Sequence, residues 1–173
     1  MTKTATGDFR ARLDREALAA AVGGLTYGTV VVLSVIIAGA TTFSDSPGVL
    51  GLVVLVTTAT FWLAHVYAHS LALSIGHDRH LSLARIGETA RREAAILGAG
   101  VPPGIALILG AVGVLEETTA VWVALALGAA LLLALGLVFA RVERLGWLGT
   151  SVAVLANLAL GTVLILLKVL VVH

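Results

Sequence analysis

Five apolar runs dominate this chain, and each is long enough to cross the roughly 30 Å hydrocarbon core of a bilayer as a helix. They cover residues 18–42, 49–74, 94–115, 119–140 and 148–172. Hydrophobic residues make up 59% of the sequence and charged residues 12%, about half the charge of a soluble globular protein. A soluble fold of this length has too little interior to bury so much apolar surface. The chain is therefore predicted to be an all-α, polytopic membrane protein with five transmembrane helices, which excludes soluble enzymes and nucleic-acid binders.

The basic residues predict the orientation of these spans. Every Lys and Arg except Lys168 lies in the N-terminal segment, in the loop after the second run or in the loop after the fourth. Cytoplasmic loops are enriched in Lys and Arg, so the N-terminus is predicted to be cytoplasmic and the C-terminus external, in the cell membrane (plasma or inner). Residues 1–17 are expected to form a cytoplasmic amphipathic segment ahead of a five-helix transmembrane domain over 18–172. The loop over residues 75–93 is expected to turn near Gly87.

Polar side chains are expensive at membrane depth, so the few that lie deep in the spans are candidate functional residues. His65 and His69 are four residues apart in the second span and share one helix face, and His80 lies near this stripe if the helix continues into the loop. We expect His65 and His69 to face the protein interior or a subunit interface. Imidazoles bind transition metals and exchange protons near neutral pH, so the pair predicts a divalent-metal site or a proton path. Ordinary hydrogen bonding between helices is the alternative.

The histidine pair is an incomplete metal site on the sequence alone. No Asp or Glu falls within the five runs, and two imidazoles without a carboxylate or thiolate are too few ligands for zinc or iron. A symmetric dimer would complete the site by bringing four histidines together. The glycine pairs Gly24-x3-Gly28 and Gly100-x3-Gly104 let helices approach closely. They predict tight assembly within the chain or a homo-oligomer, with a dimer favoured.

Unusual groups in other spans lie at about the depth of His65, counting 1.5 Å per residue. They are Tyr27 in the first span, Asn157 in the fifth, and Pro102 with Pro103 in the third. Because proline removes a backbone donor and disturbs the preceding turn, the third span is expected to be kinked or broken around Pro102 and Pro103. A packed bundle in which Tyr27 and Asn157 satisfy each other is the alternative to a central site. The common depth predicts an ion path through Tyr27, His65, His69, His80 and Asn157.

Two stretches resemble a known family. Gly24-Leu25-Thr26-Tyr27-Gly28-Thr29-Val30-Val31 resembles a Gly-Leu-Asn-Asp-Gly-Leu-Val segment in the first span of the vacuolar iron transporter family. The run over residues 133–148, with its Arg141-Val142-Glu143-Arg144 loop, is similar to that family's last hairpin. The resemblance implies a five-span fold with the N-terminus inside. The family's metal-site residues are not matched, since Tyr27 stands where the family has an aspartate and Met1 is the only methionine.

These features together predict an ion or divalent-metal transporter with a mid-membrane site. A passive cation or proton channel and a non-transporting structural or accessory membrane subunit are the alternatives. No enzymatic activity is expected, because the spans hold no carboxylate pair. Cysteine is absent, which excludes disulfides and thiolate metal sites. The expected partners are the lipid bilayer and further copies of the chain, and a divalent transition metal is the cofactor that the histidines suggest.

Overall fold

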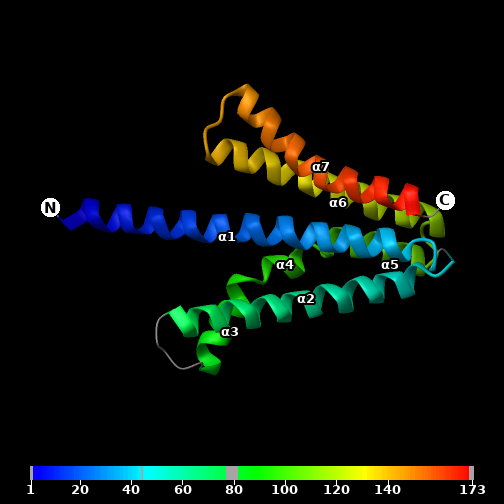
Figure 1. Ribbon diagram of the computed structural model, residues 1–173, viewed down its shortest axis with the longest axis horizontal. Helices are drawn as coiled ribbons and strands as arrows, with labels where there is room; N and C mark the ends of the chain where they lie inside the picture. The colour runs from blue at the N-terminus through cyan, green and yellow to red at the C-terminus, as the bar shows by residue number, and fades with distance from the viewer. Residues whose placement is uncertain (1, 44, 77–81, 172–173) are drawn as a thin grey trace.

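The chain folds into helices that run back and forth along one long axis (Figure 1). The computed structural model describes residues 2–43, 45–76 and 82–171, and the regular secondary structure of these ranges is entirely helical. Helix α1 (Thr2–Gly39) begins at one end of the molecule, and α7 (Trp147–Val171) ends at the opposite end. The predicted all-α class is confirmed over the described residues.

The helices of this chain have the length and composition of membrane spans. Within the described residues, three are long and apolar enough to cross a bilayer: Arg15–Gly39 within α1, Pro47–Ser74 within α2 (Pro47–Gly76), and α6 (Glu117–Val142). The bent pair Leu83–Gly98 and Val101–Ala111 would make a fourth span. In α7, the part over Trp147–Ala159 is a shorter apolar helix. The protein is therefore built to be embedded in a membrane.

The N-terminal segment and the first span form one continuous helix. Helix α1 is 38 residues long and passes through residues 17 and 18, where the sequence analysis divides the segment from the span. No proline interrupts this stretch, so nothing ends the hydrogen-bond ladder there.

The loop after α2 contains a helix of its own, α3 (Leu83–Arg92). The Oγ of Ser82 caps it by accepting a hydrogen bond from the backbone N–H of Arg85, at 3.4 Å. The expected turn near Gly87 is wrong, because Gly87 lies inside α3. A single glycine costs a helix about 1 kcal/mol relative to alanine, which the Ser82 cap and the packing of α3 on α2 offset.

The third span is broken ahead of its prolines. Helix α4 (Ala95–Gly98) and α5 (Val101–Ala111) are separated at residues 99–100, and the bend between Leu83–Gly98 and Val101–Ala111 is 53°. Pro102 and Pro103 lie in the first turn of α5, where the missing N–H costs no helix bond. The break therefore falls in the turn before the prolines.

The core lies between α1, α2, α5 and α6, and two glycines allow close helix contacts, Gly28 between α1 and α4 and Gly128 between α6 and α1. A Cβ on Gly28 would lie 2.5 Å from the carbonyl oxygen of Ile96, and one on Gly128 would lie 2.6 Å from Leu33 Cδ2. Small residues allow this close approach of helices in membranes. The fully buried side chains include Val32, Leu33, Ile36, Leu50, Leu107 and Leu132.

Candidate metal centre

His65 and His69 project from one side of α2. Their ring centroids are 6.5 Å apart, as expected for side chains separated by one helical turn. Their side chains are 43% and 49% exposed, so the expectation that they face the interior of the chain is wrong. The reason is their position at the edge of the bundle, where α1 and the α3–α4 junction cover only one side of the pair. A subunit interface over the open side stays a prediction.

Glu93 brings a carboxylate to this pair from another part of the chain. Its Oε2 lies 3.4 Å from His65 Nε2, and its Oε1 lies 3.6 Å from His69 Nδ1. The Glu93 side chain is only 13% exposed. It sits at the C-cap of α3, where its backbone N–H donates to the carbonyls of Thr89 and Arg91. The end of α3 therefore fixes the backbone from which the carboxylate extends.

Contacts from α1 and α2 hold the α3–α4 junction beside the histidines. Trp62, one turn before His65 on α2, donates its Nε1–H to the carbonyl of Ala90 at 3.3 Å. On the other side of the junction, the carbonyl of Ile96 lies against Gly28 of α1. Glu93 lies between these two anchored positions. The sequence between Ala90 and Ile96 therefore has little freedom to carry the carboxylate away.

The three side chains have the chemistry and spacing of a metal site. One ligand atom from each of His65, His69 and Glu93 can be chosen so that all lie within 4.8 Å of one another. Ligands about 2.1 Å from a tetrahedral ion lie about 3.4 Å apart, close to the His65–Glu93 separation of 3.4 Å. Two imidazoles and a carboxylate are a known ligand set for zinc, and they leave coordination positions open for exchange.

No family model, no curated protein and no solved structure matches the chain. The resemblance to vacuolar iron transporters therefore stays a prediction.

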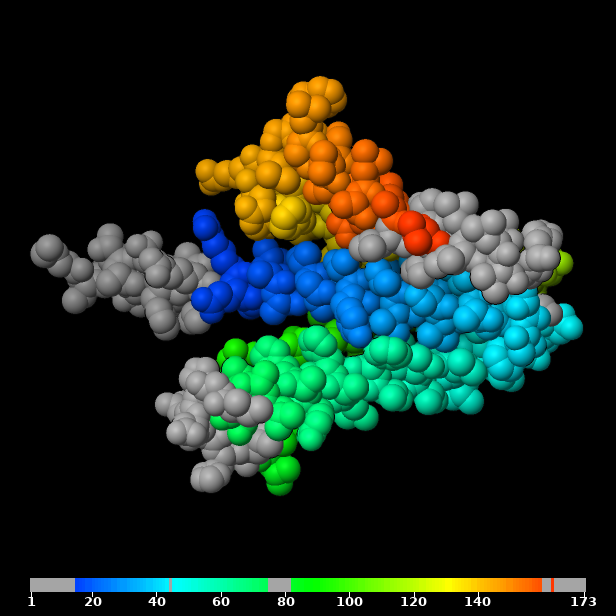
Figure 2. Space-filling view, viewed as in Figure 1, coloured from blue at the N-terminus to red at the C-terminus, as the bar shows by residue number. Residues whose placement is uncertain are grey.

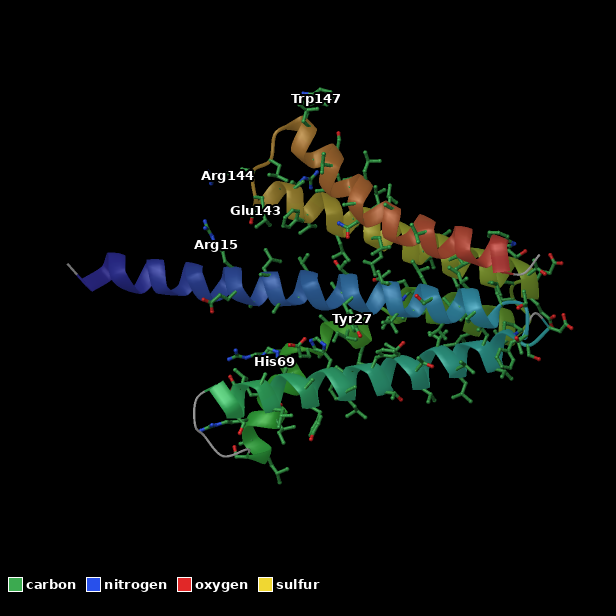
Figure 3. The ribbon with its side chains drawn as sticks, in the orientation of Figure 1. Arg15, Tyr27, His69, Glu143, Arg144 and Trp147 are labelled. Atoms are coloured by element: carbon green, nitrogen blue, oxygen red, sulfur yellow. The ribbon has the colours of Figure 1, made fainter. Side chains whose placement is uncertain are left out.

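Tyr27 lies next to the cluster of His65, His69 and Glu93. Its ring centroid is 5.6 Å from that of His65, with the planes tilted by 34°, and Figure 3 shows Tyr27 and His69 between α1 and α2. Tyr27 also lines a cavity of about 530 Å³ that Asn157 reaches from α7. The Asn157 Nδ2 donates to the carbonyl of Ala153 at 3.1 Å. Tyr27 thus stands between the histidines and the cavity that holds Asn157.

The other predicted site residues have different positions. His80 lies outside the described residues. Pro102 and Pro103 border the break in the third span and supply no ligand to the centre, and Pro103 is fully buried. Their neighbours Gly100 and Gly104 line a separate apolar groove between α2 and α5.

Sequence reasoning missed Glu93. It lies one residue before the third apolar run and follows Arg91 and Arg92, so the sequence pattern assigns it to the charged loop. An acidic residue at the first position outside an apolar run was the available signal. The third candidate ligand therefore comes from the same chain, whereas the sequence pattern predicts the missing ligands from a second copy.

Proposed function

We propose that this chain is a multi-pass cell-membrane protein that binds a divalent transition metal at His65, His69 and Glu93 and carries it across the membrane. The observation that supports this best is the convergence of Glu93 on both imidazoles, with one carboxylate oxygen 3.4 Å from one ring and the other 3.6 Å from the second. Burying a carboxylate costs free energy unless it is paired. A bound cation would offset that cost and hold the two histidines close to each other.

The donor atoms favour a borderline divalent ion. Imidazole nitrogen suits Zn²⁺, Fe²⁺, Co²⁺ and Ni²⁺, and soft ions such as Cu⁺ prefer sulfur ligands. The chain has no cysteine, and Met1 is its only methionine. Three ligands with half-exposed imidazoles leave room for water or a further donor, so the ion can exchange. A transported substrate has to be released, and an open site of this kind suits that requirement.

We further propose five spans, with α7 as the fifth, a cytoplasmic N-terminus and an external C-terminus. Helix α7 is 25 residues long, enough for about 37 Å of rise. The start of α1 and the end of α7 at opposite ends of the molecule support an odd number of crossings (Figure 1). His69 lies seven residues before the end of α2 at Gly76, about 10 Å along the helix. The proposed centre is thus in the half of the bundle nearer the basic, cytoplasmic end.

A homodimer is the proposed assembly. The side chains of His65 and His69 are 43% and 49% exposed in the single chain. An imidazole facing lipid leaves a polar nitrogen without a partner. A second copy or water over this face would remove that cost. Light scattering of the detergent-purified protein tests the assembly, with a dimer expected and a monomer contradicting it.

Zinc uptake into proteoliposomes tests the transport function. Vesicles containing a trapped zinc-sensitive dye should report uptake with the wild-type protein, and His65→Ala and Glu93→Gln should each abolish it. Glu88→Gln is the matched control, because Glu88 is an exposed glutamate on α3 that pairs with Arg92. Uptake by Glu93→Gln equal to that of wild type would contradict the proposal.

A proton channel is the second candidate function. The carboxylate of Glu93 faces both imidazoles at ion-pair distance, and such a group can pass protons between them. A trapped pH-sensitive dye in the same vesicles separates the two functions. Proton flux without zinc flux would favour the channel. Zinc binding with neither flux would favour an accessory subunit.

A further inference from the structure

A cavity on the other side of α1 has no role in the proposed metal transport. It has a volume of about 530 Å³ and lies between α1, α6 and α7. Its size falls within the range of about 300–1,000 Å³ that is usual for sites that bind small molecules. The side chains around it include Val22, Val30, Leu135 and Phe139.

The lining of this cavity suits an alkyl chain better than an ion. Three of its side chains are polar, and two of them already bond to their own helices: Thr26 Oγ1 donates to the carbonyl of Val22 at 2.8 Å, and Asn157 Nδ2 to that of Ala153 at 3.1 Å. Tyr27 is the third polar group. So few oxygen atoms cannot replace the hydration shell of a cation. A hydrocarbon chain needs no such replacement.

Basic side chains lie at the end of the cavity that faces the α6–α7 turn. Figure 3 shows Arg15 on the side of α1 toward that turn, which carries Glu143 and Arg144. Arg141 lies in the last turn of α6. Neither Arg15 nor Arg144 makes an ion pair within the described part of the chain, where the ion pairs are those of Glu93 and of Glu88. Glu16 follows Arg15 but lies about 100° round the helix.

The distance between the basic residues and the cavity matches half of a bilayer. Val22 and Val30 are seven and fifteen residues beyond Arg15 on α1, which places them about 10 and 22 Å from it along the axis. One leaflet of hydrocarbon is about 15 Å thick. A phosphate group at the level of Arg15 would therefore extend its chains to the depth of the cavity. In Figure 2 the α6–α7 hairpin (yellow to orange) rises away from α1 (blue) at this end, which leaves an approach from the side.

We propose that this cavity binds one anionic phospholipid of the bilayer, with an acyl chain between α1, α6 and α7 and the phosphate between Arg15 and Arg144. Guanidinium groups bind phosphate through paired hydrogen bonds. The apolar side chains below them contact the chain. The site does not include His65, His69 or Glu93, so this proposal does not depend on the metal proposal.

Two variants remove the two halves of this site independently. A Cβ on Gly23 meets nothing within 4 Å, and Gly23 lines the cavity, so the side chain of Gly23→Leu is expected to occupy part of it. Arg15→Gln with Arg144→Gln removes the charges. Gly104→Leu is the control for Gly23→Leu, because Gly104 lines the separate groove between α2 and α5 and also has open space at its Cβ position. Arg85→Gln with Arg91→Gln, on α3, is the control for the Arg15/Arg144 variant.

Native mass spectrometry of the delipidated protein in detergent, with dioleoylphosphatidylglycerol or dioleoylphosphatidylcholine added, measures the binding. We expect one phosphatidylglycerol to be retained by wild type and by both controls. Gly23→Leu and the Arg15/Arg144 variant should each retain it at least tenfold less, and phosphatidylcholine should bind no better to wild type than to the variants. If Gly23→Leu retains as much phosphatidylglycerol as Gly104→Leu, the proposal that the cavity holds an acyl chain is wrong. If the Arg85/Arg91 control loses as much phosphatidylglycerol as the Arg15/Arg144 variant, the proposed headgroup site is wrong. The same follows if wild type retains both lipids equally. The circular dichroism spectrum and thermal unfolding of each variant show that it is folded.

Discussion

Gly28 is where α1 touches the backbone of α4, and replacing it by alanine is predicted to destabilise the protein. A Cβ at this position would lie 2.5 Å from the carbonyl oxygen of Ile96 and 2.9 Å from the Cβ of Ala99. Neither atom is the end of a flexible side chain, so α4 has to move away from α1. Glu93 lies three residues before Ile96. The same movement is therefore expected to displace the carboxylate from the histidines.

Gly23 on the same helix is the matched control for the size of this effect. A Cβ there meets nothing within 4 Å. Glycine to alanine gains helix propensity of about 1 kcal/mol at either position, so this gain cancels in the comparison. Overpacking a well-packed neighbour costs about 1–3 kcal/mol, and only Gly28→Ala incurs it. The Gly28→Ala variant should thus unfold about 1–3 kcal/mol more easily than Gly23→Ala, or about 2–12 °C lower for a chain of this size.

Thermal unfolding of the two detergent-purified variants, followed by circular dichroism with and without Zn²⁺, measures the difference. We expect Gly28→Ala to melt below Gly23→Ala and to gain less from Zn²⁺. Equal melting temperatures would refute the close contact between α1 and α4. A lower melting temperature with an unchanged zinc response would refute the claim that this contact positions Glu93.

Three further substitutions or fusions test other parts of the account. Ser70→Ala should keep or raise stability, because Ser70 Oγ is buried without a hydrogen-bond partner in the described structure and such a group costs about 1–3 kcal/mol; a clear loss of stability would count against this. Trp62→Phe should lower the free energy of unfolding by about 1 kcal/mol through the lost bond to Ala90, and Trp147→Phe, at a side chain 78% exposed, should not. A reporter fused to the C-terminus should be active only outside the cytoplasm, and cytoplasmic activity would contradict five spans with the N-terminus inside.

The class of the protein and one face of its site could be predicted from the sequence because both depend on local pattern. Long apolar runs predict membrane helices wherever they fold, and the i, i+4 spacing of His65 and His69 places them on one side of any helix. Their exposure could not be predicted, because it depends on how far α1 and the α3–α4 junction extend over that side. The sequence pattern predicts a turn near Gly87, whereas the structure has a helix there. The Ser82 cap starts α3 ahead of Gly87, and the helix continues through the glycine.

The position of the third candidate ligand, Glu93, depends on tertiary structure. Glu93 lies beside the histidines because α3 contacts α2 at the Trp62–Ala90 hydrogen bond and ends three residues later, at Glu93. Residues 77–81, between α2 and α3, lie outside the described structure, and no periodicity in the sequence predicts where α3 ends. The hydrophobic period predicts which face of a helix is covered, whereas the position of a helix end relative to another helix depends on the packing of the whole bundle.

Metal-dependent thermal stabilisation tests most directly whether His65, His69 and Glu93 form one metal centre. Zinc at one hundred times its dissociation constant should stabilise the wild-type protein by about 2.7 kcal/mol, or about 5–10 °C. Glu93→Gln keeps the size of the side chain and removes the anionic ligand, so it should lose most of this shift, as should His65→Ala and His69→Ala. Glu88→Gln should keep it. A full zinc response in Glu93→Gln would contradict the centre, and the contacts of Glu93 with the two histidines would then be ion pairs only.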